Sequence, residues 1–155
     1  MIRGVSLAYH LLSLSLIEEY KLSGRCADRG GEREVQFLWS ARSRVLPVWD
    51  EGRLRLIRWG CRRDESRELP CTGCTWQATV DAGGWQRFRA RAVEVPATLV
   101  LEGAVWVLVR EGLWGLLVTD ESCIDHVYLI CEPSSYYYRV MTRGEWMPVL
   151  IGERF

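Results

Sequence analysis

Short apolar runs separated by turns dominate the second half of the chain. Glycine, proline and acidic residues stand between the runs. Strands of this length at roughly ten-residue spacing are typical of an antiparallel sheet system or a barrel. We therefore predict that residues 93–151 form most of one continuous antiparallel system, with Trp59, Trp106 and Trp114 largely buried. The runs cover residues 93–100, 105–109, 113–118, 127–131, 136–141 and 147–151.

The first half of the chain has a mixed pattern. Residues 11–21 show the spacing of an amphipathic helix, although their Leu-Ser alternation would also suit a strand. Residues 23–34 are polar and rich in glycine, which predicts a surface loop. Residues 45–49 and 53–59 flank a short turn, so they predict a hairpin with one arginine-bearing face. Residues 83–91 predict a short helix.

Length and composition favour a single domain that spans residues 1–155. The chain is 48% hydrophobic and 26% charged, which are ordinary proportions for a globular protein. The pattern as a whole predicts an α+β fold, mainly antiparallel β with a few short helices. The formal net charge is zero, so no overall field draws the chain toward nucleic acid or a membrane.

The basic residues are almost all arginines. Lys21 is the only lysine among the 20 basic residues. A GC-rich genome would produce this bias without functional meaning. Alternatively, forked guanidinium groups suit phosphates and stacked bases better than ammonium groups do. Eight Trp and six Tyr add flat surfaces for stacking, although most large aromatic side chains fill cores.

The six cysteines are expected to be free thiols. Residues 5–17 are apolar enough for part of a signal peptide, but His10 interrupts them and no cleavage site follows. No run reaches the roughly 18 apolar residues of a membrane span. We therefore expect a cytoplasmic protein with no membrane contact. Cys71-Thr-Gly-Cys74 lacks the second ligand pair of a zinc site, so we expect no metal and no cofactor.

His126 is interpreted as a structural residue at the start of a strand. Cys123 and Asp125 are its neighbours in sequence, whereas catalytic triads are assembled from distant segments. The sequence contains neither a phosphate-binding loop motif nor a dinucleotide-binding motif. Tyr136-Tyr137-Tyr138 is expected to form part of a strand, with its rings on alternate sides.

Ordered segments along nearly the whole chain match those of a known family. One segment is residues 95–103, Val-Pro-Ala-Thr-Leu-Val-Leu-Glu-Gly, which aligns without a gap to the family's Val-Pro-Ala-Asp-Gly-Phe-Tyr-Glu-Trp. The others are residues 1–7, Leu46-Pro47-Val48-Trp49, Arg58-Trp59-Gly60, residues 77–82, Glu111-Gly112-Leu113-Trp114, residues 127–130 and Trp146-Met147-Pro148-Val149-Leu150. Taken in their order along the chain, these segments resemble those of the SOS-response-associated peptidase (SRAP) family. The resemblance implies an SRAP-like barrel or packed sheets, and a protein that binds single-stranded DNA and crosslinks to abasic sites.

The resemblance also implies a degenerate active site, because three of the family's four catalytic positions differ here. Ile2 replaces the cysteine whose amine and thiolate close on the abasic aldehyde. The family's histidine falls at about Gly144, and its asparagine falls on Gln77. Only Glu102 matches the family's catalytic glutamate, and it is either catalytic or structural. A thiolate is a strong nucleophile near neutral pH, whereas isoleucine offers none.

The leading interpretation is a diverged SRAP-like protein of the DNA-damage or SOS-response type. It is expected to bind single-stranded or abasic-site DNA without crosslinking, through arginine–phosphate contacts and base stacking. The predicted DNA contacts are Arg53, Arg55, Arg58, Trp59, Gln77, Arg87, Arg89 and Arg91. One alternative is a protein-interaction or regulatory module that kept the fold without binding DNA, which the zero net charge favours. Another is a residual lyase- or peptidase-like enzyme that uses Glu102 with the terminal amine.

Overall fold

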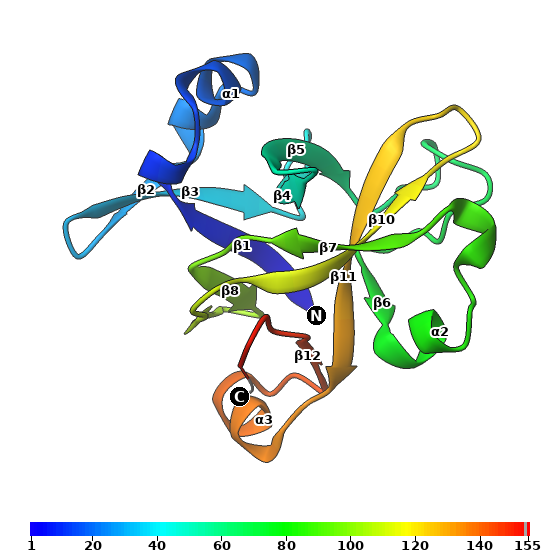
Figure 1. Cartoon of the computed structure of the whole chain (residues 1–155). Coiled ribbons are helices and arrows are strands. Elements are labelled where there is room, and N and C mark those ends of the chain that lie inside the picture. The colour runs from blue at the N-terminus through cyan, green and yellow to red at the C-terminus, as the bar shows by residue number, and fades with distance from the viewer. Residues whose placement is uncertain (154) are drawn as a thin grey trace.

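A computed structural model describes residues 1–153 and 155 as a strand-rich fold (Figure 1). The strands are β1 (Ile2–Ala8), β2 (Cys26–Arg29), β3 (Glu32–Leu38), β4 (Val45–Asp50), β5 (Arg53–Trp59), β6 (Cys74–Trp76), β7 (Arg91–Val95), β8 (Leu99–Glu102), β9 (Val105–Leu108), β10 (Leu113–Thr119), β11 (Asp125–Pro133) and β12 (Trp146–Pro148). The helices are α1 (Leu14–Glu19), α2 (Gln77–Asp81) and α3 (Tyr136–Thr142), with 3₁₀ turns η1 (Tyr9–Leu11), η2 (Leu22–Arg25) and η3 (Gln86–Phe88). No helical segment of this described part has both the length and the apolar character that crossing a bilayer requires.

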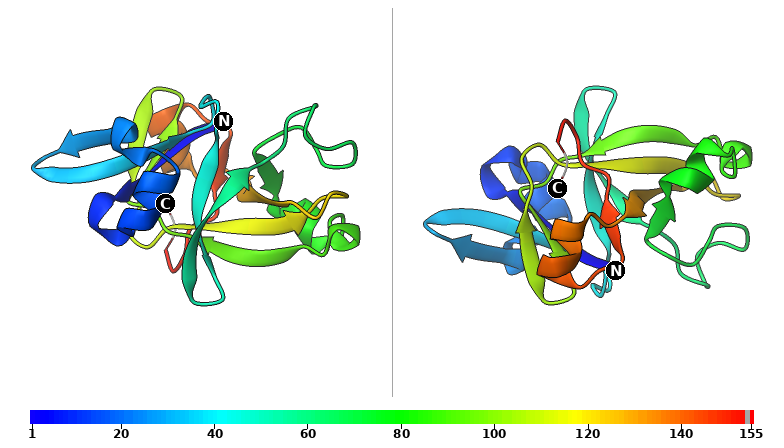
Figure 2. Two further views of the ribbon diagram at one scale, coloured as in Figure 1. Left: turned by 90° about the horizontal axis from the view of Figure 1, so that it is seen from above. Right: turned by 90° about the horizontal axis from the view of Figure 1, so that it is seen from below.

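The strands form two sheets that pack against each other. The first sheet has the order β2-β3-β1-β8-β9, and all its pairings are antiparallel. The second has the order β10-β7-β4-β5-β11-β12, and β10 also pairs with β11, which closes five of its strands into a barrel. Figure 2 shows the β2–β3 hairpin projecting at one end of the molecule and the β10–β11 hairpin at the other.

The core joins the inner faces of the two sheets. Val5 and Phe37 from the first sheet and Val48 and Trp59 from the second belong to one cluster of fully buried side chains. Burial of apolar area on this scale is the main stabilising contribution. A smaller cluster under α2 and η3 holds Trp85 against Tyr128, with ring centroids 4.7 Å apart.

The predicted fold class is confirmed: the chain is α+β, with mainly antiparallel strands and short helices. The hairpin predicted over residues 45–59 is β4–β5, paired from Val45↔Arg58 to Asp50↔Arg53. The helix predicted over residues 11–21 is the shorter α1, which begins after Ser13. The Ser13 hydroxyl accepts a hydrogen bond from the Leu16 N–H, as an N-cap residue does.

Three predicted segments differ from the structure. Residues 23–34 are not a loop but contain β2 and the start of β3, joined by a turn in which Gly30 and Gly31 have positive φ. Residues 83–91 form only η3 before β7 begins at Arg91. Tyr136–Thr142 is the helix α3 and not a strand, because Ser135 caps it by accepting a hydrogen bond from the Tyr138 N–H.

The second half of the chain does not form one continuous antiparallel system. β8 and β9 belong to the first sheet, and β11 runs parallel to both β5 and β6. Trp59 is fully buried as predicted, whereas Trp106 and Trp114 are only half-buried. The long β11 pairs with several short strands in turn, an arrangement that strand periodicity alone does not encode.

Gly60 should tolerate no side chain, because the end of β5 packs directly against the backbone of the loop before β6 at this residue. Its φ is +58°, and a Cβ there would lie 2.2 Å from the Thr72 carbonyl oxygen. Gly60→Ala is expected to lower the free energy of unfolding by about 3 kcal/mol or more. Gly103→Ala is the control: its φ is +61°, but nothing lies within 4 Å of the added Cβ. Urea denaturation should therefore show a loss near 1 kcal/mol for the control; equal losses would contradict the steric argument.

Candidate functional site

Glu102 lies at the point where the first residue of the chain meets the end of β8. Ile2 and Glu102 are paired across β1 and β8, and the Met1 α-amino group forms an ion pair with Glu102 Oε1. Glu102 is only 2% exposed. The Tyr138 hydroxyl donates a hydrogen bond of 3.4 Å to Oε2 of the same carboxylate. Both oxygens of this buried carboxylate therefore have a donor from a distant part of the chain.

The end of α3 places Gly144 against the same carboxylate. Arg143 ends the helix with a φ of 60°, which turns the chain back toward β8. A Cβ on Gly144 would lie 3.1 Å from Glu102 Oε1. Met1, Glu102, Tyr138 and Gly144 are referred to below as the Met1–Glu102 site. Three segments that are far apart in sequence thus meet at one acidic group (Figure 1).

Two thiols lie beside this site, but neither is a ready nucleophile. Cys131 on β11 and Cys74 on β6 are both buried, and all six cysteines are free thiols. A hydrogen bond with Cys74, together with burial, raises the pKa of Cys131 well above its usual range, and the negative charge of Glu102 adds to the shift. Cys131 therefore stays protonated near neutral pH, and its thiol is a poor nucleophile.

Two exposed tryptophans, Trp76 at the end of β6 and Trp146 at the start of β12, flank the same stretch of β11. Trp76 is paired with Cys131, and Trp146 is paired with Pro133. The two rings stack with centroids 4.1 Å apart and planes at 27°, and the residues are 40% and 39% exposed. Arg139 and Arg143 from α3 line a hollow of about 470 Å³ together with Trp146. Flat aromatic surface and guanidinium groups are therefore available side by side.

The predicted arginines lie elsewhere and are largely paired with carboxylates. Arg55 and Arg91 both bind Asp50, and Arg55 also binds Asp125 at 3.1 Å. Burial opposes ionisation of Asp50, but hydrogen bonds from Arg91 and Arg55 lower its pKa. Arg58 binds Glu65 at 3.3 Å. No hydrogen bond or ion pair among the described residues joins these arginines to the Met1–Glu102 site. The exposed arginines among the predicted contacts are Arg53, Arg87, Arg89 and Arg91, and of these only Arg91 has an ion pair within the described residues.

Two other predicted DNA contacts are placed differently from each other. Trp59 is fully buried, and its indole N–H donates to the Gly73 carbonyl at 3.0 Å, so it is a core residue and not a stacking platform. Gln77 begins α2 directly after Trp76, and its side-chain amide donates to Asp81 at 2.8 Å. Gln77 thus directly follows one member of the exposed tryptophan pair, and its side-chain amide is hydrogen-bonded within its own helix.

Several residues of the site could not be recognised from sequence. The sequence pattern predicts a strand over residues 136–141, so it does not bring Tyr138 and Arg139 to this site, nor Arg143 just beyond them. The Ser135 cap is the available signal for a helix. Trp76 and Trp146 are two of eight tryptophans, and nothing local distinguishes them from those in the core. Their contact depends on β6 and β12 flanking β11, which is a long-range arrangement.

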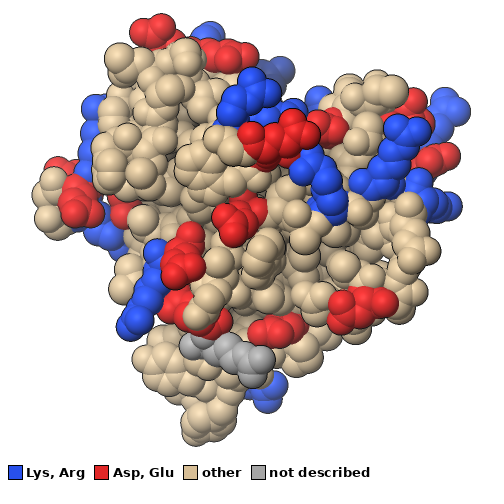
Figure 3. All heavy atoms as spheres, viewed as in Figure 1, with Lys and Arg blue, Asp and Glu red and all other residues tan. Residues whose placement is uncertain are grey.

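The surface around these elements has mixed charge. Figure 3 shows Lys and Arg side chains next to Asp and Glu on the visible face, without a continuous basic surface. In the described part of the chain, no group of three His, Cys, Asp or Glu side chains is arranged to hold a metal ion. Comparisons with protein-family models, with curated proteins and with solved structures gave no match.

Proposed function

We propose that this chain is a diverged SRAP-like protein, acting in the cytoplasm on damaged or exposed DNA, that binds single strands without crosslinking. The observation that carries the proposal is the meeting of Met1, Glu102 and Gly144. The resemblance aligns Glu102 with the family's glutamate and places its histidine at about Gly144. Met1 precedes Ile2, which stands at the position of the family's cysteine and is paired with Glu102. The support is that these residues lie close together in space, because segments that align with the family one at a time need not be neighbours in the fold.

The surface beside the Met1–Glu102 site has the groups that single-strand binding needs. Bases stack on aromatic rings with little dependence on sequence, at about 1–3 kcal/mol per base. Trp76 and Trp146 offer such rings, and Arg139 and Arg143 can reach phosphates next to them. The binding is proposed to be non-covalent because residue 2 carries no thiol and the nearby Cys131 thiol is buried.

Removing either exposed tryptophan should weaken binding of a single-stranded oligonucleotide. Trp76→Ala and Trp146→Ala are each expected to raise Kd by about tenfold, which corresponds to the loss of one stacked base. Trp49→Ala is the matched control, because Trp49 on β4 is 41% exposed and lies outside this surface. Fluorescence anisotropy of a labelled oligonucleotide at low salt measures all three affinities. If the Trp49 variant binds the oligonucleotide as weakly as the other two variants do, the bases do not stack specifically on Trp76 and Trp146.

Salt dependence separates phosphate contacts from stacking in the same assay. Each phosphate neutralised by an arginine contributes about −0.7 to the slope of log K against log salt for a single strand. Arg139→Gln should therefore flatten the slope by about that amount, whereas Trp76→Ala should lower affinity at every salt concentration without changing the slope. No binding at low salt would contradict the proposal.

A protein-interaction module is the second candidate function, and α3 is the observation that favours it. Tyr136, Tyr137 and Val140 leave a largely apolar side of this helix exposed, while Tyr138 is fully buried. Exposed apolar residues gathered on one short element are typical of a protein contact. Failure of the wild-type chain to bind DNA at low salt, with intact folding, would favour this function.

A further inference from the structure

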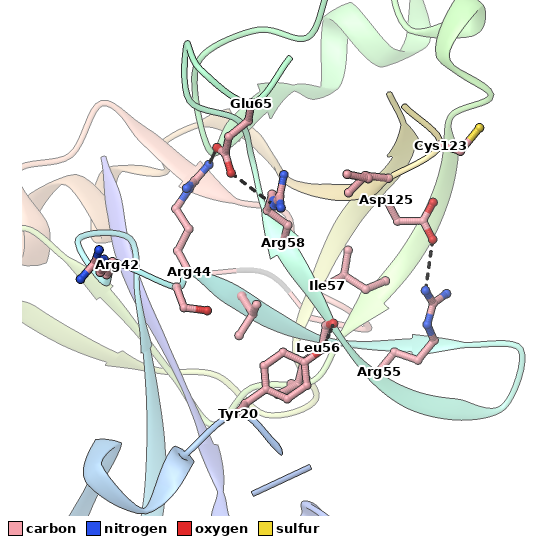
Figure 4. A pocket seen from close by; sticks show the side chains of 13 residues that line it. Tyr20, Arg42, Arg44, Arg55, Leu56, Ile57, Arg58, Glu65, Cys123 and Asp125 are labelled. Atoms are coloured by element: carbon pink, nitrogen blue, oxygen red, sulfur yellow. Dashed lines mark hydrogen bonds and ion pairs between the residues drawn. The ribbon is translucent and has the colours of Figure 1, made fainter. Parts of the chain in front are cut away.

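A second polar site lies away from the Met1–Glu102 site, in a pocket beside β5. It has a volume of about 550 Å³ and shares no lining residue with the hollow beside Trp146. Its walls come from the end of α1, the chain entering β4, strand β5, the loop before β6 and the start of β11 (Figure 4). The charged groups that line it are Arg42, Arg44, Arg55, Arg58, Glu65 and Asp125. This set is called the arginine pocket below.

The charges of the arginine pocket leave an excess of positive groups. Four guanidinium groups face two carboxylates, and both carboxylates are already engaged. Glu65 pairs with Arg44 and with Arg58, and Asp125 pairs with Arg55. Arg55 also binds Asp50, which lies outside the lining and is shared with Arg91, so the excess of positive charge remains. Burial opposes ionisation of Glu65, but the hydrogen bond from Arg44 and one from the Arg62 backbone lower its pKa. Arg42 is exposed at the rim and forms no ion pair within the described residues. The pocket therefore attracts anions.

Arg44 is a buried charged residue in the wall of the pocket. The residue is 4% exposed and runs along one wall of the pocket to Glu65, with the Trp39 ring 5.0 Å from its guanidinium carbon. Its Nε–H is buried and has no acceptor within the described part of the chain. An unbonded buried donor on a charged group is costly, and natural structures leave few such groups. Among the residues that the structure describes, the Arg44 charge is balanced only by Glu65, which Arg44 shares with Arg58.

The shape and chemistry of the pocket select among anions. Guanidinium groups bind phosphate oxygens through paired hydrogen bonds, and several arginines suit a dianion better than a single carboxylate. Val45, Leu56, Ile57 and Ile124 add apolar lining next to these groups, with the Tyr20 ring at one side. A volume of this size exceeds what inorganic phosphate alone needs, so room remains for an attached organic group. We propose that the arginine pocket binds a phosphate monoester, as a free nucleoside monophosphate or as the 5′ end of a strand.

The test compares ligands that differ only in the phosphate. Isothermal titration of the full chain with adenosine 5′-monophosphate and with adenosine should show binding of the nucleotide and at least tenfold weaker binding of the nucleoside. Inorganic phosphate should compete with the nucleotide. A second pair, 5′-phosphorylated and 5′-hydroxyl oligonucleotides, distinguishes the two sources of the group. Stronger binding of the free nucleotide supports a small-molecule ligand, and stronger binding of the phosphorylated strand supports an end-recognition site. Equal affinity for both members of each pair would overturn the proposal.

Variants connect the binding to this pocket. Arg42→Gln and Arg58→Gln are chosen because both residues keep solvent access, so the fold should survive, whereas the buried Arg44 is left in place. Each is expected to raise Kd for the nucleotide by about tenfold. Arg53→Gln is the matched control, since Arg53 is an exposed residue of β5, the strand that carries Arg58, but does not line the pocket. Unchanged affinity in both pocket variants would overturn the assignment. Trp76→Ala should leave nucleotide binding intact, so this result is independent of the proposed single-strand binding.

Discussion

Replacing His126 with alanine should lower the free energy of unfolding by about 3–5 kcal/mol. His126 is fully buried, and its two ring nitrogens face two acceptors. Nδ1 donates to the Gly60 carbonyl at 2.7 Å, and Nε2 lies 2.8 Å from Asp120 Oδ2. Removing the ring leaves a buried carboxylate without its partner and a cavity between β5 and β11. Urea denaturation at pH 7 measures the loss.

His10→Ala is the control for this variant, because His10 is the only other histidine and is exposed. Its effect should stay within about 0.5 kcal/mol, as for most surface substitutions. A loss below about 1 kcal/mol in the His126 variant would mean that water replaces the ring at little cost.

The pH dependence of the same variant has a defined sign. Burial alone would raise the pKa of Asp120, but hydrogen bonds from His126 and from the Ile124 and Ser122 N–H groups lower it below its usual value. A carboxyl whose folded pKa is depressed contributes stability above its unfolded pKa of about 3.9, and that contribution is lost as the pH falls through the folded pKa. The difference in the free energy of unfolding between wild type and His126→Ala should therefore become smaller below about pH 4. There Asp120 becomes protonated, and a neutral carboxyl is less destabilised by the loss of its partner.

Local sequence predicted the strands and turns better than it predicted their partners. The β4–β5 hairpin was found because both strands and their turn lie within residues 45–59. The parallel pairing of β11 with β5 and β6 joins residues more than fifty positions apart, and no local pattern encodes it. The apolar and aromatic run over residues 136–141 predicts a strand, whereas the Ser135 cap favours the helix Tyr136–Thr142 that the structure has.

The candidate site was predictable only where the family resemblance named its members. Glu102 and the position of Gly144 came from aligned segments, and the structure brings them into contact. The arginines were chosen for their charge, but equal numbers of acidic and basic residues meant that many would be paired. Arg55 and Arg91 meet on Asp50, a contact that requires β5 and β7 to flank β4 in the sheet. Arg55 and Arg58 instead became part of the arginine pocket.

The unmodified chain should form no stable adduct with abasic-site DNA. A thiazolidine closes when an amine and a thiol of one residue both bond to the aldehyde carbon and water leaves. Met1 has the amine without a thiol, Ile2 packs in the core, and the Cys131 thiol is buried. The Met1 amine alone would give at most a reversible imine, visible on denaturing gels only after borohydride reduction. A stable adduct without reduction would mean that another nucleophile acts here.

Restoring two of the three missing groups, the thiol and the imidazole, should restore crosslinking. Ile2→Cys puts a thiol opposite Glu102 in the β1–β8 register, and removal of Met1, verified by mass, gives that residue a free amine. Gly144→His adds an imidazole next to the carboxylate; Gly144 has no positive φ, and Glu102 need yield only a few tenths of an ångström to its Cβ. The double variant should form the adduct about a hundredfold faster than Ile2→Cys with Gly144→Ala, which has the same Cβ without the general acid–base group. If the processed, folded double variant forms no adduct, Glu102 is a structural carboxylate, and its ion pair with Met1 serves to anchor the first strand.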